Sequence, residues 1–106
     1  MKPMTLALVL AFATGSAVAF AAERSIMQKG RAFSESAVTI KKGETLIFVN
    51  DDNIVHNILS ASPGNEFNLG SQGPGVSTPV TLNKTGDVAV LCAIHPRMKL
   101  TVTVTD

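Results

Sequence analysis

The sequence predicts an all-β domain, either a sandwich or a barrel, because short strand-like segments alternate with turn residues along most of it. Near the C-terminus, Leu100, Val102 and Val104 alternate with threonines, a period of two that is typical of a strand with one face on a core. Downstream of the apolar N-terminal stretch, no segment keeps a helical period over the length of a helix. We see no internal repeat and no second domain.

Seven further segments have the residue types of strands. In chain order they are 25–28 at a sheet edge, 37–40, 45–49, 54–59, 66–69, 79–82 and 87–92. The run 87–92 is apolar on both faces, which predicts a more central strand. The segments 37–40 and 45–49 are joined by Lys41-Lys42-Gly43-Glu44, a turn sequence in which glycine accepts a positive φ. The Gly-, Ser-, Pro- and Asn-rich stretch 60–78 is expected to be a long loop around the short strand 66–69.

The first 21 residues are typical of a secretory signal peptide. Lys2 supplies a positive charge, an apolar run of eight residues follows at 6–13, and small residues stand in A-x-A register at 17–19 and 19–21. The apolar run is much shorter than the ~20 residues that cross a bilayer, which argues against a permanent membrane anchor. We therefore expect export to the periplasm, with cleavage after Ala21 or the next alanine; cleavage after Ala21 leaves a single domain at 22–106.

The charge and the cysteine count limit the class of protein. Loss of Lys2 with the signal peptide lowers Lys and Arg from nine to eight, against eight Asp and Glu, and no basic stripe indicates nucleic acid. A domain of this size often needs a disulfide or a metal in addition to its core. One cysteine cannot form an internal disulfide. In an oxidising compartment a lone thiol is open to oxidation unless it is buried or bound to a metal. The cysteine count therefore favours a metal.

The segment CAIHPRM, residues 92–98, combines Cys92, His95 and Met98 at spacings of three. Pro96 argues against a helix interior, so the three side chains are expected on a loop between two strands, where a tight turn can direct them to one point. Thiolate, imidazole and thioether are soft to borderline ligands. With one further imidazole they complete the site of two His, one Cys and a weak axial Met that is typical of electron-transfer copper.

The other histidine, His56, lies 36 residues before Cys92 on a different predicted strand and can meet the loop if a sandwich brings the strands together. Zinc is the competing metal, but structural zinc sites use Cys and His in fours, and a thioether is a poor zinc ligand. Taken singly, a buried cysteine, a methionine and a histidine are each more often structural than ligating. Taken together, the only cysteine and both histidines match one mononuclear copper site.

These residues resemble the ligand motif of the cupredoxins. The Cys-x-x-His-x-x-Met spacing is most similar to the amicyanin-like members, whose ligand loop is equally short and has proline after the histidine. The segments VTIKKGETLIFVN and VNDDNIVHNI also resemble the family's strands before its first histidine ligand, so the similarity covers about residues 36–106. The resemblance implies a small Greek-key β-sandwich of about seven to eight strands, with one mononuclear type 1 copper ion at one end.

Carried over residue by residue, the resemblance implies that His56, Cys92 and His95 are the equatorial copper ligands and that Met98 is the axial one. It further implies that Asn57 ties the two ligand-bearing segments together and steadies the thiolate by hydrogen bonds. Arg97 departs from the family, in which an apolar or aromatic residue precedes the methionine. The departure leaves the identity of the partner open.

The sequence supports a soluble carrier of one electron between redox partners, with copper alternating between Cu(I) and Cu(II). The alternatives are a periplasmic copper-binding protein for tolerance or delivery and a metal-free structural sandwich. An enzyme is not expected, because four protein ligands leave no open coordination position. We expect a monomer whose redox partner docks near His95 and has an acidic patch facing Arg97 and Lys99.

Overall fold

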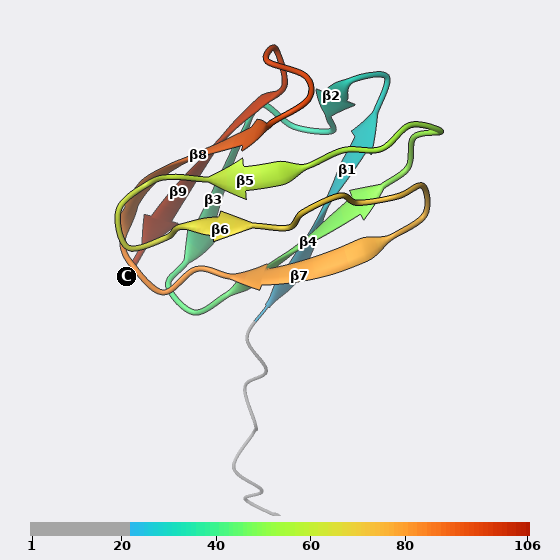
Figure 1. The fold of residues 1–106 in the computed structure, drawn as a ribbon. Helices are drawn as coiled ribbons and strands as arrows, with labels where there is room; N and C mark the ends of the chain where they lie inside the picture. Colours follow the sequence, from blue (N-terminus) through green and yellow to red (C-terminus); the bar gives the residue numbers. More distant parts are fainter. Residues whose placement is uncertain (1–21) are drawn as a thin grey trace, which may run out of the picture.

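The computed structural model describes residues 22–106, which form two β-sheets packed face to face (Figure 1). The predicted signal peptide, residues 1–21, lies outside the described residues. Within residues 22–106 the regular structure is entirely β, and no helix there is long and apolar enough to cross a membrane. The nine strands are β1 (Glu23–Lys29), β2 (Ala32–Phe33), β3 (Ala37–Lys41), β4 (Thr45–Asn50), β5 (Ile58–Ser60), β6 (Phe67–Asn68), β7 (Ser77–Thr81), β8 (Gly86–Cys92) and β9 (Lys99–Thr105).

The strand order confirms the predicted Greek-key sandwich. One sheet has the order β2-β1-β4-β7 and the other the order β3-β9-β8-β5-β6, so the chain crosses repeatedly between the sheets. Two pairs are parallel, β1 with β4 and β3 with β9, and the other pairs are antiparallel. β8 lies inside its sheet, between β9 and β5, as its apolar sequence predicts. The described chain contains one strand more than the expected seven to eight, namely β2.

Alternate residues of the longer strands form the core between the sheets. In β9 the predicted inward residues Leu100, Val102 and Val104 are buried, while the threonines between them face outward. Phe48 in β4 is fully buried, and its ring lies 6.4 Å from that of Phe33 and 5.9 Å from that of Phe67, between ring centroids. Burial of one such side chain contributes about 1.5–3 kcal/mol. The core therefore ties the short edge strands β2 and β6 to the central strands.

The prediction that segment 25–28 is an edge strand holds for most of the segment but not for its end, because β2 pairs with β1 at Gln28 and Lys29. The reversal depends on Gly30 and Arg31, whose φ angles of 61° and 59° turn the chain back on itself directly after β1. A strand of two residues carries no period, so the hydrophobic pattern does not reveal it.

The predicted strand 54–59 is shorter in the structure, where β5 begins at Ile58. The side chain of Asn50 takes the place of a strand ladder here by donating to the main-chain oxygen of Ile54 at 2.9 Å. His56 pairs with Gln72 only as an isolated bridge. The segment between β4 and β5 is therefore mostly a loop.

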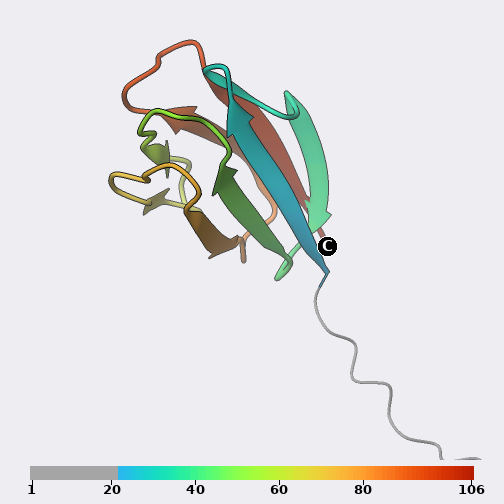
Figure 2. The same cartoon turned by 90° about the vertical axis from the view of Figure 1, so that its right-hand side faces the viewer.

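The turn at Gly43 crosses from one sheet to the other, and its φ of 88° confirms the predicted glycine conformation. The main-chain N–H of Gly43 donates to Leu82 and that of Lys42 to Thr105. From this end β4 runs the length of the sandwich. Figure 2 shows its far end beside the β1–β2 turn and the loop after β8, at the end of the sandwich away from the C-terminus.

Candidate metal centre

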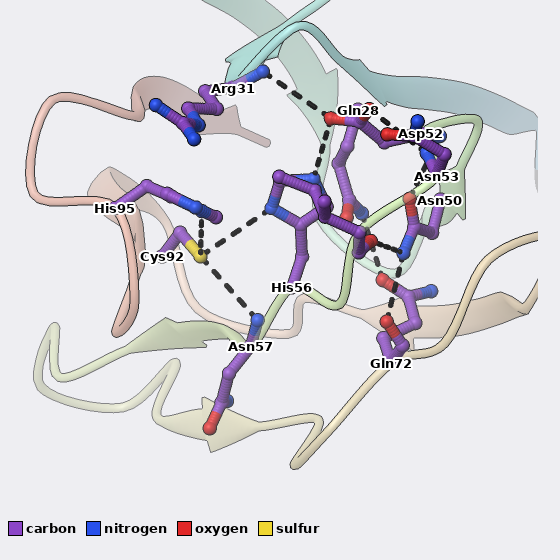
Figure 3. A network of polar contacts seen from close by, with 11 residues as sticks. Gln28, Arg31, Asn50, Asp52, Asn53, His56, Asn57, Gln72, Cys92 and His95 are labelled. Atoms are coloured by element: carbon purple, nitrogen blue, oxygen red, sulfur yellow. Dashed lines mark hydrogen bonds and ion pairs between the residues drawn. The ribbon is translucent and has the colours of Figure 1, made fainter.

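Three of the predicted ligand side chains meet at this end of the sandwich (Figure 3). The sulfur of Cys92 lies 3.8 Å from Nδ1 of His56 and 3.7 Å from Nδ1 of His95. Within residues 22–106, these three form the one group of at least three His, Cys, Asp or Glu side chains close enough to hold a metal ion, with ligand atoms all within 4.8 Å of one another. The structure therefore assembles side chains from two segments that lie far apart in the sequence.

The spacing of the donor atoms fits a shared metal ion. Bonds of ~2.0–2.3 Å directed about 120° apart separate two ligand atoms by roughly 3.5–4 Å. The two sulfur-to-nitrogen distances, 3.7 and 3.8 Å, lie in this range. One thiolate with two imidazoles is also the donor set of trigonal copper sites. Both the geometry and the chemistry of these residues suit copper.

Cys92 is the last residue of β8, and its position is set by the pairing of β8 with β5. Ile58 lies opposite Cys92 in the antiparallel register, and the thiol is almost fully buried. The main-chain N–H of Asn57 points to the sulfur at 3.4 Å, and the main-chain oxygen of Asn57 accepts from Ala93 at 2.9 Å. The side chain of Asn57 donates instead to Asn68 at 2.8 Å. Asn57 thus contacts the ligand loop through its main chain.

His56 is fully buried, and hydrogen bonds hold both its main chain and its imidazole ring. Its main-chain N–H donates to Gln72 at 3.1 Å, and its main-chain oxygen accepts from the N–H of Gln72 at 2.7 Å. Its Nε2 lies 3.1 Å from a carboxylate oxygen of Asp52. The hydrogen bond from His56 lowers the pKa of Asp52 below its ordinary value, against a smaller opposing effect of burial.

The contact with Asp52 selects the tautomer of His56. An ionised carboxylate can only accept a hydrogen bond, so Nε2 of His56 carries the proton and donates to Asp52. Nδ1 then keeps its lone pair on the side that faces Cys92. A carboxylate behind a ligating imidazole orients the ring and makes it more basic, as in many metal sites. Sequence reasoning missed Asp52, although its position four residues before His56 in a polar run was visible.

A buried polar network lies behind His56 and fixes Gln72. The side chain of Gln72 accepts from the amide of Gln28 at 2.9 Å and donates to the main-chain oxygens of Phe48 and Val76 at 2.8 and 3.0 Å. The side chain of Asn50 donates to the main-chain oxygen of Gln72 at 2.8 Å. The sequence signal for this network was a polar residue at an inward position near the end of a strand, Gln28 in β1 and Asn50 in β4.

His95 and Met98 lie on the loop after β8, joined by a turn. The main-chain N–H of Met98 donates to His95 at 3.0 Å, and the residues between them, Pro96 and Arg97, are exposed. Met98 is only 1% exposed and belongs to the hydrophobic core, whereas His95 is half-buried. The loop therefore carries one predicted ligand into the core and leaves the other near the surface.

Comparison with known protein families identifies the domain. Residues 20–105 match the family described as "Copper binding proteins, plastocyanin/azurin family". The chain belongs to this family. The match confirms the cupredoxin resemblance seen in the sequence, and family and donor set together fit one mononuclear type 1 copper ion in this cupredoxin. No curated protein sequence matches it.

Solved structures with the same fold include small cupredoxins and a part of a larger enzyme. A purple cupredoxin from Nitrosopumilus maritimus is 26% identical with a TM-score of 0.69, and the match covers 77% of this chain and 99% of that one. A Cu(I) amicyanin variant is 15% identical with a TM-score of 0.71, covering 77% and 81%. A copper-containing nitrite reductase from Thermus scotoductus SA-01 is 24% identical with a TM-score of 0.73, covering 80% of this chain. This cupredoxin spans only 23% of the nitrite reductase.

Replacing Gln72 with leucine should destabilise the metal-free protein. The change leaves the buried amide N–H of Gln28 without its acceptor and removes one donor from the main-chain oxygens of Phe48 and Val76. Leaving a buried donor without its acceptor costs about 1–3 kcal/mol in the free energy of unfolding. Urea unfolding followed by circular dichroism measures the loss. The neighbouring exposed substitution Ser71→Ala should change the value by less than ~0.5 kcal/mol. Equal stability of the two variants would show that the Gln72 network does not hold the His56 segment.

Proposed function

We propose that this cupredoxin is an exported carrier of single electrons that binds one copper ion through His56, Cys92, His95 and Met98. Bound copper would supply the redox chemistry by alternating between Cu(I) and Cu(II). The observation that supports the proposal most directly is the convergence of the His56, Cys92 and His95 donor atoms within 4.8 Å. The fourth ligand, Met98, follows on the same short loop as His95.

The surroundings of these residues suit electron transfer because they hold the ligands in place. Cys92 ends an interior strand, and His56 is clamped by main-chain bonds to Gln72 and a side-chain bond to Asp52. Side chains that are held in this way need little rearrangement when the charge of a bound metal changes, and a small rearrangement favours fast transfer. His95 is half-buried on an exposed loop, so its ring is the natural route between the site and a docked partner.

We infer that the protein is not itself an enzyme. Four ligands from the protein leave no coordination position for a substrate, and catalytic metal sites keep one open. Electron transfer needs no such position. The nitrite reductase among the similar structures is a much longer chain, and this cupredoxin corresponds to less than a quarter of it.

The proposed location is the periplasm, to which the signal peptide at residues 1–21 would direct the protein for export. There the protein would act as a monomer and meet a redox protein at the His95 end. Exposed cations on the ligand loop, among them Arg97, favour a partner whose docking face is acidic.

Replacing Cys92 with serine should abolish the visible colour of the copper-loaded protein. Intense visible absorption is expected from a Cu(II)–thiolate bond, and serine supplies no thiolate. Absorption spectra of the purified mature protein with Cu(II) test this, with circular dichroism to show that the fold is kept. The adjacent exposed substitution Ala93→Ser is the control and should leave the band in place. A colourless wild-type protein at full copper loading would contradict the type 1 assignment.

Replacing Met98 with glutamine should keep the copper and lower the reduction potential. An amide oxygen is a harder donor than a thioether, so it favours Cu(II) over Cu(I). We expect a decrease of at least ~59 mV, the equivalent of a ten-fold change in relative affinity for a one-electron couple. Protein-film voltammetry measures the potential, with Met27→Gln, in β1, as the control that leaves it unchanged. A potential that stays the same or rises in the Met98 variant would show that Met98 is not the axial ligand.

Deletion of the gene distinguishes an electron-transport function from a copper-tolerance function. In the mature chain both histidines belong to the proposed site, and Met27 is the one methionine left over, so the capacity is a single ion. We therefore expect a respiratory or redox-substrate defect at ordinary copper levels, together with rapid electron self-exchange in the pure protein. Growth curves with and without excess copper, and NMR line broadening in mixtures of the two redox states, measure these. Copper sensitivity as the sole phenotype, or slow self-exchange, would favour the tolerance function.

A further inference from the structure

Two arginines from distant parts of the chain line one surface hollow beside His95. The hollow has a volume of 450 Å³, and its lining residues are Arg31, Ile94, His95, Pro96 and Arg97. Figure 3 shows Arg31, from the β1–β2 turn, on the outer side of the site near His95. Arg31 lies far from the ligand loop in the sequence, and the sandwich brings it there.

The charges of the two arginines are available to a partner. Within residues 22–106, no ion pair or hydrogen bond engages the guanidinium group of Arg31 or Arg97, and both residues are exposed. Of the two aspartates at this end, Asp51 pairs with Lys29 at 3.9 Å, and Asp52 contacts His56 at 3.1 Å and the main-chain N–H of Arg31 at 3.4 Å, not its guanidinium group. The hollow is therefore lined by two guanidinium groups that no carboxylate within residues 22–106 pairs with.

Arg31 is held in an unusual backbone conformation. It is the one residue other than glycine in the described chain with a positive φ, 59°, and a left-handed conformation is unfavourable for a residue that carries a side chain. Its main-chain N–H points to the carboxylate of Asp52 at 3.4 Å, the same oxygen that accepts from His56. The β1–β2 turn is thus fixed against the segment that carries His56, which places the Arg31 side chain relative to the metal centre.

We propose that this hollow is the docking site for a redox partner that presents a carboxylate beside an apolar contact surface. The guanidinium fork matches a carboxylate with two parallel hydrogen bonds. Ile94, which is 51% exposed, and Pro96 supply the apolar area that forms the dry centre of an interface. The inference rests on the proposed electron-carrier function and names the chemistry of the partner. It also revises the sequence-based expectation, since Lys99 does not line the hollow and Arg31 does.

Small redox reagents test the site without the natural partner. Stopped-flow absorbance follows reduction of the Cu(II) protein at low salt by Fe(II)–EDTA, a dianion covered with carboxylates, and by hexaammineruthenium(II), a dication. Arg31→Ala and Arg97→Ala should each slow the reaction with Fe(II)–EDTA about five-fold and not slow the reaction with the dication. Lys99→Ala removes a charge of the same sign outside the hollow and should slow reduction by Fe(II)–EDTA less than about two-fold. The differences should disappear in high salt, where the Debye length falls to ~3 Å.

Two further measurements separate a local site from an effect on folding or on copper. Arg31→Gly removes the charge but relieves the left-handed conformation, so it should slow Fe(II)–EDTA as Arg31→Ala does while stabilising the fold. In the metal-free protein, the inert trianion hexacyanocobaltate(III) should shift the side-chain NMR signals of Arg31 and Arg97 but not that of Arg24. Equal slowing by the Arg31 and Lys99 variants, with no selective shift, would overturn the docking site. Failure of the electron-carrier proposal would give a different result from failure of the docking site, because neither reagent would then reduce any of the proteins quickly.

Discussion

The register of β5 against β8 determines which side chains meet at the metal centre. Ile58 lies opposite Cys92, so His56, just before β5, and the loop that follows Cys92 come to the same end of the sandwich. A slip of one residue would turn Cys92 to the other face of its sheet, because successive side chains of a strand alternate. The main-chain bond from Ala93 to Asn57 and the bond from the Asn57 N–H to the Cys92 sulfur hold this register where the ladder ends. Every feature of the site builds on that pairing.

Polar residues inside the sandwich then make the site rigid. Gln28, Asn50 and Gln72 are buried where a larger apolar core would be expected. Burying a polar group is unfavourable unless it forms hydrogen bonds, and these three bond to one another and to the main chain. Their bonds fix Gln72, and the main chain of Gln72 fixes His56. Rigidity at a proposed metal ligand is thus obtained from groups that do not touch the metal.

The sequence revealed those parts of the fold and site that local chemistry determines. The alternation in β9 and the turn at Gly43 follow from period and residue type, and the proposed copper donors follow from their rarity and spacing. It did not reveal β2, the short β5 or the place of Arg31. β2 and the place of Arg31 depend on the left-handed turn after β1, and the short β5 on the side-chain bond from Asn50 to the main-chain oxygen of Ile54; neither produces a hydrophobic period.

Asp52 contacts both the buried site and the surface segment beside it. One of its carboxylate oxygens accepts from His56 Nε2, and the main-chain N–H of Arg31 points to the same oxygen. The orientation of a proposed ligand and the position of a proposed docking residue therefore share a single acceptor. A partner bound at Arg31 would meet a surface that is tied to His56 through two hydrogen bonds, so the distance from docked partner to site varies little. A constant distance is what a carrier needs for a reproducible transfer rate.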